Sequence, residues 1–396
     1  MKVTFVSNYI NHHQIPVSNV MYEIFKDGYR FVETEPMEEE RIRMGWGSTF
    51  SDIPYLMKFY EEEDECRRLI AESDVVIFGG TEREELIEER IEKGLPVIRY
   101  SERLYKEGQW KCISPRGLVK KYHDHTRHSD KPVYLLCSGA YVQDDFSIIQ
   151  AYKGKRFKWG YFPEFVSYSE EERKSRRDER RSHEVLRILW AGRLIDWKHP
   201  ESVIYLSEYL KKKEIPFHIS VIGDGDMRQN LTETSESKGL GECITFLGSR
   251  KPSEVREEMN RSDIFLMTSD YKEGWGAVLN EAMNGACAVV ASHGAGAVPT
   301  LIEHQQNGLV FPSGKFDVMC SLVEDLSRDQ KWRLFLGESA YETLEKEWNH
   351  RVAGERLAKL CEQVVSGKPE FNESGPLSEA VVIHQRKMYK SLVGER

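Results

Sequence analysis

Short apolar runs alternate along the chain with longer stretches in which apolar residues recur every three or four positions. The runs have the length of buried strands, and the stretches have the spacing of amphipathic helices. In the first part of the chain, strands are predicted at residues 2–7, 29–34, 74–80, 95–101 and 131–138, and helices at 15–27, 60–73, 82–93 and 144–152. Strands that alternate with helices indicate a parallel sheet covered on both faces.

The pattern is interrupted at residues 168–184, where almost every side chain is polar, and then it restarts. Such a segment is typical of a linker or an exposed helix between domains. Beyond it, strands are predicted at 186–192, 216–225, 243–248, 263–269, 286–292 and 308–312, and helices at 200–213, 226–238, 252–261, 277–285, 315–327, 331–346, 350–365 and 377–391. The repeated α/β pattern predicts two Rossmann-like, doubly wound domains with a cleft between them. Ligands of such sheets bind beyond the carboxyl ends of the strands.

Length and composition exclude several classes of protein to which the chain could belong. The chain has 396 residues, which suits two domains, and its net charge of −9 argues against nucleic acid as the main partner. No apolar stretch reaches the ~18 residues of a membrane span, and the first residues read as a strand, not a signal peptide. The seven cysteines are scattered and include no CxxC pair, as in a protein with reduced thiols. A cytoplasmic protein is therefore expected.

Two basic residues follow the predicted strand at 186–192. Arg193 comes directly after the strand and its terminal Gly192, and Lys198 follows five residues later. Arginine offers a planar fork for phosphate, and lysine offers a compact positive charge. The pair could neutralise the charge on a departing nucleoside diphosphate, although a solvated loop is the simpler alternative for these two residues alone.

The segment EGWGAVLNE holds the most informative pattern in the chain. Glu273 and Glu281 stand eight positions apart, and Gly274, Trp275 and Gly276 form the loop that opens the helix between them. Glycines let backbone amides approach a ligand closely, and a helix N-terminus favours an anion. The first carboxylate could accept hydrogen bonds from sugar hydroxyls, and the second could bind ribose. A partner for the helix dipole would account for one glutamate but not for both.

Polar residues also follow two strands of the first half. Asn11, His12 and His13 come after the first strand, and Glu102 follows the strand at 95–101. Because carboxyl ends of parallel strands share one edge of the sheet, these residues are candidates for binding an acceptor. A histidine there could orient an acceptor hydroxyl. The alternative is that the histidines are structural loop residues.

A glycine turn follows the predicted strand at 216–225. Gly223 begins the stretch GDGDM, but the third glycine of a dinucleotide fingerprint is replaced by Arg228, so an NAD site is not expected. Asp224 and Asp226 form a DxD pair of the kind that binds metals. A turn that ends a strand explains them more simply.

The run HDHTRH at residues 123–128 could ligate a metal, but its polar surroundings predict an exposed loop instead. No metal site is therefore expected. Basic residues surround the run: Arg116, Lys120, Lys121, Arg127 and Lys131. This basic patch is open to three interpretations, namely a site for an anionic acceptor, a peripheral contact with the inner membrane face, or a solvated surface.

Several motifs together resemble the retaining glycosyltransferases of GT-B architecture, specifically family 4. The matching pieces are AGRLIDWKHP, VIGDGDM, FLGSRKPSEV, EGWGAVLNEAM and GAGAVPTLIEHQQNGLVFP, which cover most of residues 186–320. The E-x7-E motif is the most specific of them. In the first half, NYINHHQIPVSNVMYEI and KWGYFPEF look like segments of bacterial polysaccharide-type members of the family.

The resemblance implies roles for matching positions. Glu273 would contact the donor sugar and Glu281 the ribose, while Arg193 and Lys198 would hold the diphosphate without a metal. Arg250 would lie near the nucleotide base. Further donor-binding positions are the glycines and the tryptophan of the matching loops: Gly192, Gly223, Gly274, Trp275 and Gly276. No cofactor is expected besides the donor substrate itself.

The resemblance also implies a domain plan. Residues 1–168 would form the acceptor-side domain, 169–184 a charged linker and 185–370 the nucleotide-sugar domain, with a C-terminal helix in 371–396 that crosses back to the first domain. The expected activity is transfer of a sugar, from a UDP-sugar in the commonest case, to a carbohydrate or lipid-linked hydroxyl with retention of configuration. The rivals are a nucleotide-sugar epimerase, a phosphorylase and a non-catalytic nucleotide-binding protein.

Overall fold

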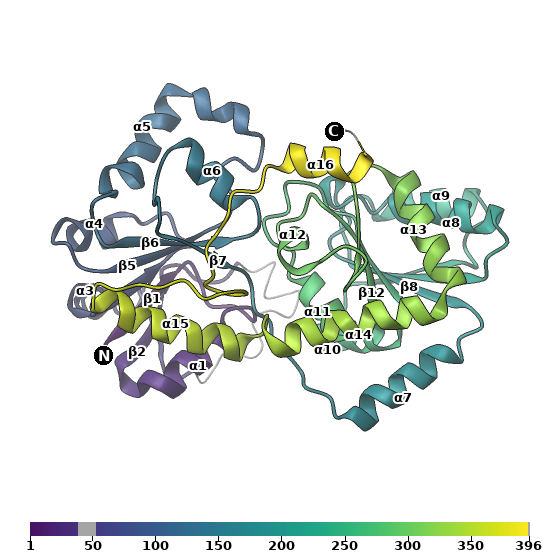
Figure 1. Ribbon diagram of the computed structural model, residues 1–396, viewed down its shortest axis with the longest axis horizontal. Coiled ribbons are helices and arrows are strands. Elements are labelled where there is room, and N and C mark those ends of the chain that lie inside the picture. The colour runs from purple at the N-terminus through teal and green to yellow at the C-terminus, as the bar shows by residue number, and fades with distance from the viewer. Residues whose placement is uncertain (39–52, 395–396) are drawn as a thin grey trace. The chain divides into compact units, whose positions relative to one another are not determined.

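The chain forms two compact units, which are described separately here as unit 1 and unit 2. The computed structural model describes residues 1–38 and 53–394. Unit 1 comprises Met1–Glu164 and Glu347–His384, and unit 2 comprises Phe165–Lys346 and Gln385–Arg396. Each unit contains one parallel sheet with helices on both of its faces (Figure 1). This arrangement confirms the predicted α/β class with two Rossmann-like sheets.

The sheet of unit 1 has seven parallel strands in the order β3-β2-β1-β4-β5-β6-β7. The strands are β1 (Val3–Ser7), β2 (Tyr29–Glu33), β3 (Leu56–Lys58), β4 (Val75–Phe78), β5 (Val97–Ser101), β6 (Val133–Ser138) and β7 (Arg156–Trp159). The central strands β1 and β4 are buried along their whole length because helices cover both faces of the sheet. The edge strands β3 and β7 were not predicted, since they are short and contain charged residues.

The helices of unit 1 include one that comes from the far end of the chain. They are α1 (Ile15–Phe25), α3 (Glu63–Glu72), α4 (Glu85–Glu92), α5 (Pro115–Asp124), α6 (Val142–Ile148) and α15 (His350–Val365), with 3-10 turns η1 (Lys26–Gly28), η2 (Gln109–Ile113) and η3 (Thr126–His128). Helix α15 packs closely on α1, since a Cβ at Gly354 would lie 2.6 Å from the Cβ of Val20. Only glycine at residue 354 allows this approach.

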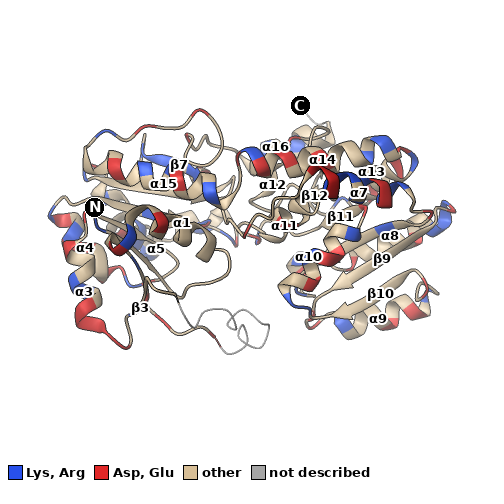
Figure 2. Cartoon of the chain, turned by 90° about the horizontal axis from the view of Figure 1, so that it is seen from below, with Lys and Arg blue, Asp and Glu red and all other residues tan. Residues whose placement is uncertain are grey.

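The sheet of unit 2 has six parallel strands in the order β10-β9-β8-β11-β12-β13. The strands are β8 (Leu186–Ala191), β9 (Phe217–Ile222), β10 (Ile244–Gly248), β11 (Ile264–Met267), β12 (Ala288–Ser292) and β13 (Leu309–Phe311). Strands β9 and β10 carry no Lys, Arg, Asp or Glu (Figure 2). The apolar residues of β8, β9 and β11 form the centre of the core of this unit.

Most helices of unit 2 agree closely with the predicted positions, but α12 was not predicted and α16 begins later than predicted. The helices are α7 (Glu170–Arg181), α8 (Ser202–Lys212), α9 (Arg228–Ser237), α10 (Pro252–Arg261), α11 (Val278–Asn284), α12 (Val298–Leu301), α13 (Phe316–Arg328), α14 (Gln330–Lys346) and α16 (Gln385–Val393), with the 3-10 turn η4 (Asp196–Lys198). No helix within residues 1–38 and 53–394 combines the length and the apolarity that a membrane crossing requires.

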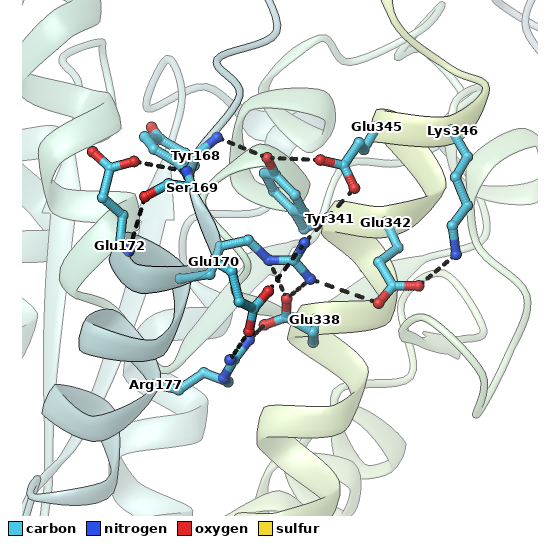
Figure 3. Close-up of polar contacts among 11 residues, drawn as sticks. Tyr168, Ser169, Glu170, Glu172, Arg177, Glu338, Tyr341, Glu342, Glu345 and Lys346 are labelled. Carbon is cyan, nitrogen blue, oxygen red and sulfur yellow. Dashed lines mark hydrogen bonds and ion pairs between the residues drawn. The ribbon is translucent and has the colours of Figure 1, made fainter.

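The polar segment expected as a linker is helix α7, and it belongs to unit 2. It begins at a capping box in which Ser169 and Glu172 exchange side-chain and backbone hydrogen bonds. Arg177 binds Glu338 of α14 at 2.9 Å (Figure 3). The guanidinium of Arg173 lies over the ring of Tyr341. These partners come from residues 150 or more positions away, so the sequence pattern alone did not reveal that the segment is docked.

The C-terminal region returns to unit 1 at Glu347, earlier than the predicted residue 371, and α16 belongs to unit 2. Residues 377–384 were predicted to be helical but run alongside β7. Leu377 donates its backbone N–H to the carbonyl of Lys158 at 2.8 Å, and Ser378 accepts from the N–H of Lys158 at 2.8 Å. Backbone groups paired in this way cannot also form helical hydrogen bonds, so α16 begins only at Gln385.

Candidate functional site

The strand order of unit 2 places β8 and β11 side by side in the middle of the sheet. The strands that follow β8 in sequence continue toward one edge, and those that follow β11 continue toward the other. The loops beyond these two strands therefore diverge and leave a crevice, which is the general position of ligand sites in open α/β sheets. Both basic candidates follow β8, and Glu273 follows β11.

The structure brings Lys198 and Glu273 together across these two loops. The amine of Lys198 lies 2.5 Å from Oε2 of Glu273, and Ser269 donates its hydroxyl to the same oxygen at 3.0 Å. The side chains of the ion pair are mostly buried. A mostly buried ion pair is costly to break unless each charge finds a new partner, so a ligand that replaces it must carry groups that compensate Lys198 and Glu273.

A buried hydrogen-bond chain holds the backbone of Lys198. The indole Nε1 of Trp190 donates to Oγ1 of Thr268 at 2.8 Å, and this hydroxyl donates to the carbonyl of Lys198 at 2.6 Å. The chain links β8, the end of β11 and the turn η4. Sequence reasoning missed Thr268 and Ser269, although both follow β11 directly, at the end of the strand where functional side chains are expected.

His199 fastens the same turn to the loop after β11. Its Nδ1 lies 2.8 Å from Oε1 of Glu201, and its Nε2 lies 3.7 Å from Oδ2 of Asp270. Hydrogen bonds to Asp270 and Glu201 raise the pKa of His199 to about 9. The imidazolium thus carries a positive charge at neutral pH, one residue from Lys198.

Arg193 is exposed, and its guanidinium lies 5.9 Å from the ring centre of Trp197. The loop that carries it packs tightly against the turn after β9. Gly223 has φ +130°, and a Cβ there would lie 1.9 Å from the carbonyl oxygen of Gly192. Only glycine at residue 223 allows these backbones to approach so closely, so packing accounts for the glycine of the predicted turn.

The glycine loop after β11 is shaped by a positive φ. Gly276 has φ +93°, and a Cβ there would lie 2.1 Å from Cε of Met267. The indole of Trp275 is buried and donates its Nε1–H to Oδ1 of Asn280 at 2.9 Å. This side chain therefore belongs to the core, and the candidacy of Trp275, like that of Gly274, rests on its backbone amide.

Glu281 lies in the first turn of α11. Loss of solvent raises the pKa of its carboxyl group to about 7, and the charge of Arg256 on α10 opposes this rise. A desolvated carboxylate next to a glycine loop is ready to accept hydrogen bonds from hydroxyl groups. Arg250, in the loop after β10, is exposed and lies 3.9 Å from Glu254.

Unit 1 has its own cluster of candidates at the carboxyl edge of the sheet. The rings of His12 and His13 are 3.8 Å apart, and the ring of His13 stacks on Tyr161 at 5.8 Å. The hydroxyl of Tyr161 donates to Oε1 of Glu102 at 2.5 Å. Three of the predicted acceptor-side residues thus meet around Tyr161, which sequence reasoning did not single out although it lies in the quoted segment KWGYFPEF.

Asn11, the fourth acceptor-side candidate, shapes the loop. Its side-chain Oδ1 accepts the N–H of His13 at 3.0 Å, and its carbonyl accepts the N–H of Gln14 at 2.9 Å. This Asx turn starts helix α1 and orients the histidines. Behind them, Gln14 donates to the hydroxyl groups of Ser7 and Tyr100 at 3.1 and 3.0 Å.

The weaker motifs are structural. Asp224 of the DxD pair binds Arg228 at 2.8 Å, which agrees with the interpretation as a turn. The histidine run was wrongly predicted to be an exposed loop. His128 is buried. Nδ1 of His125 lies 2.9 Å from the hydroxyl of the buried residue Tyr152. Among the residues that the structure describes, no group of three or more His, Cys, Asp or Glu side chains is placed to hold a metal.

Comparison with known proteins shows a family that unit 2 resembles. Residues 171–343 match the family model "Glycosyl transferases group 1", a range that lies in unit 2 and includes all the donor-side candidates. This part of the chain is thus similar to the group 1 glycosyltransferases, which are also called glycosyltransferase family 4. The chain is 29% identical over 187 residues to the amylovoran biosynthesis glycosyltransferase AmsK of Erwinia amylovora, an alignment that covers 46% of each protein. The chain thus spans about half the length of the curated relatives it matches.

Solved structures show the same overall fold. HepE of Anabaena in complex with UDP has a TM-score of 0.69 and 14% identity, with 92% of this chain and 100% of that chain covered. The pneumococcal O-GlcNAc transferase GtfA in complex with UDP and GlcNAc has a TM-score of 0.66 and 11% identity, with 92% and 99% covered. At these identities the likeness defines the fold, which is GT-B.

Proposed function

We propose that the protein is a retaining glycosyltransferase that moves a sugar from a nucleotide-sugar to a hydroxyl acceptor. The observation that carries this proposal is the contact between Lys198 and Glu273 across the two loops at the centre of the sheet of unit 2. A basic and an acidic group held there can bind the two halves of a sugar diphosphate. The similarity of residues 171–343 to the group 1 glycosyltransferases supports the same reaction.

In the proposed reaction, the bond between the anomeric carbon and the diphosphate breaks, and the acceptor oxygen bonds to that carbon on the same face. The acceptor proton passes to the leaving phosphate. Lys198, Arg193 and the amides of Gly274 and Gly276 stabilise the negative charge that grows on the diphosphate. When the phosphate binds the amine of Lys198, the carboxylate of Glu273 leaves this ion pair and accepts hydrogen bonds from the sugar hydroxyls.

For the donor we propose a UDP-sugar, with the ribose held by Glu281 and the base beside Arg250. The titles of the HepE and GtfA structures name UDP. A relative from Mycobacterium tuberculosis that is 22% identical over 177 residues is described as a GDP-mannose-dependent mannosyltransferase. The main alternative to UDP as the donor nucleotide is therefore GDP. We propose further that the acceptor is a carbohydrate or a lipid-linked sugar in polysaccharide or glycoconjugate synthesis, and that it lies beside His13, Tyr161 and Glu102.

The first test is turnover of site variants. Arg193→Ala and Glu273→Ala should each lower turnover by at least ~100-fold, the scale of losing one preorganised contact. Glu236→Ala on the exposed surface of α9 is the matched control and should leave turnover unchanged. Near-normal turnover in both site variants would refute the assignment. Conversion of the donor sugar without any acceptor would indicate an epimerase instead.

The donor is tested by thermal unfolding with UDP, GDP, ADP, TDP and CDP, each in EDTA and in magnesium. A ligand at ~100 times its dissociation constant stabilises the folded state by about 2.7 kcal/mol. UDP should raise the melting temperature equally in both buffers, and Glu281→Ala should remove most of the shift. A larger rise in melting temperature with GDP than with UDP would identify GDP as the donor nucleotide. A rise that occurs only with magnesium would contradict metal-independent binding.

A further inference from the structure

The surface around α5 is apolar where a water-soluble helix is normally polar. Four large apolar side chains on η2 and α5 are mostly exposed: Trp110 at 68%, Ile113 at 76%, Val119 at 70% and Tyr122 at 60%. Leu118 adjoins them at 43%. Single exposed apolar residues are common, but here five lie within 13 consecutive residues of one turn and one helix, which is an unusual concentration for a water-exposed surface.

Helix geometry shows that α5 presents its apolar side outward. Leu118, Val119 and Tyr122 recur with the spacing of one helix face. Gly117, Lys121 and Asp124 are the less exposed residues and occupy the opposite face. No residue of α5 is buried, and the helix lies at the periphery of unit 1 (Figure 1). The usual arrangement of an amphipathic helix on a protein core is thus reversed.

The charge of this segment is opposite to that of the whole chain. Residues 109–122 contain four basic side chains and no acidic one, whereas the chain as a whole has a net charge of −9. The four are Lys111, Arg116, Lys120 and Lys121. Arg116 is exposed beside the apolar stripe, and Lys111 and Lys120 form ion pairs with Glu107 and Asp124 at the ends of the segment. Basic groups therefore border the apolar face.

We propose that this α5 surface docks on an anionic lipid bilayer, with Trp110, Ile113, Val119 and Tyr122 inserted at the level of the headgroups. Apolar and aromatic side chains bordered by lysine and arginine are what an interfacial helix requires. Tryptophan and tyrosine favour the boundary between lipid and water, where the ring is apolar and its polar atom stays hydrated. An acidic protein needs such a local basic border to approach anionic lipid at all.

The α5 surface lies close in sequence to an acceptor-side candidate, which connects membrane docking with access to the acceptor. The α5 surface and the acceptor-side candidate Glu102 lie in the same connection between β5 and β6, with seven residues between Glu102 and Trp110. Docking would bring that edge of unit 1 near lipid-borne molecules. The docking itself does not depend on the proposed reaction, so its test uses binding alone.

The test is flotation of the full chain with phosphatidylcholine vesicles that contain or lack phosphatidylglycerol. Wild type should float with the anionic vesicles, and added salt should weaken binding. Lys111→Gln with Arg116→Gln should weaken it about 30-fold, because each basic group near anionic lipid contributes about fivefold. Val119→Asp should abolish it. The controls Phe335→Ala and Lys174→Gln alter exposed residues of unit 2 and should bind like wild type.

None of these positions is buried, since Lys111 is half-buried and the others are exposed, so the variants should keep the melting temperature of wild type. The proposal is overturned if wild type does not float with anionic vesicles, or if Val119→Asp and the double variant bind as tightly as wild type. It is also overturned if sedimentation shows a dimer that Val119→Asp dissociates, because the apolar face would then be covered by a second copy of the chain.

Discussion

Lys198 is held from three directions before any ligand arrives. Its amine contacts Glu273, its carbonyl accepts from Thr268, and the neighbouring His199 bonds to Glu201. A side chain fixed in this way loses little further freedom when a phosphate binds. At the scale of single residues, the proposed donor site of unit 2 is therefore largely preorganised.

Gly223 offers a direct test of the packing behind this site. Gly223→Ala should lower the free energy of unfolding by at least ~1 kcal/mol, because the residue has φ +130° and its Cβ would meet the carbonyl of Gly192. Gly241→Ala is the control, since a Cβ there meets nothing within 4 Å. Urea denaturation of both variants measures the difference. Equal stability of the two would contradict the packing described here.

His199 predicts a pH dependence of stability. Its folded-state pKa of about 9 lies above the ordinary value of 6.5, so protonation favours the folded state. This contribution is complete below about pH 6.5 and is lost as the pH rises through about 9. His199→Gln should therefore flatten the fall in unfolding free energy over that interval. A variant with the slope of wild type would show that the imidazole does not carry this effect.

At the scale of elements, α7 is a charged helix that docks through one buried arginine. The guanidinium of Arg180 donates to five backbone carbonyls of the segment between α10 and β12, namely those of Met259, Asn260, Ser262, Gly285 and Ala286. One polar side chain thus satisfies the ends of two other helices. The composition of α7 gives no sign of this role, because the other ten charged residues of the helix are all exposed or half-buried.

Arg180→Ala should lower the free energy of unfolding by roughly 3 kcal/mol or more, because it leaves buried carbonyls without a donor. Arg181→Ala, one residue along the same helix, removes an exposed ion pair with Asp178. This substitution should change the free energy of unfolding by less than ~1 kcal/mol. Chemical denaturation monitored by tryptophan fluorescence separates the two. Similar effects of both substitutions would show that α7 is not anchored by Arg180.

Sequence periodicity predicted the long elements of both sheets and failed at their margins. The central strands were recognised because both of their faces are buried and the apolar run is continuous. Strands β3 and β7 contain only three and four residues. Residues 377–384 were predicted to be helical, although residues 377–380 pair with β7. Short edge segments owe their conformation to partners distant in sequence, which a local pattern does not contain.

At the scale of the whole molecule, unit 1 is completed by the segment Glu347–His384, which lies more than 300 residues after β1 in the sequence. Helix α15 lies on α1, and the residues after it add to the edge at β7. Both ends of the chain are thus needed to form one unit. Contacts between segments so distant in sequence raise the contact order of unit 1, which predicts slower formation during folding.

Gly354→Ala tests this closure. The added Cβ would lie 2.6 Å from that of Val20, and overpacking of this kind typically costs about 1–3 kcal/mol. Hydrogen exchange should increase in α1 and α15, while the strands of unit 2 keep the protection of wild type. Glu355→Ala, at the exposed neighbouring position, is the control and should leave exchange unchanged. Unaltered exchange in Gly354→Ala would contradict a tight contact between the two helices.

The sequence by itself determined the α/β class, the two-fold repetition of the pattern and the donor-side candidates from Arg193 to Glu281. These follow from local periodicity and from short motifs whose residues are close in sequence. The tertiary structure alone decided that Lys198 meets Glu273, that Tyr161 joins His13 to Glu102, and that the apolar side of α5 faces outward. Each depends on which distant segments become neighbours, and that is fixed by burial and backbone pairing over the whole chain.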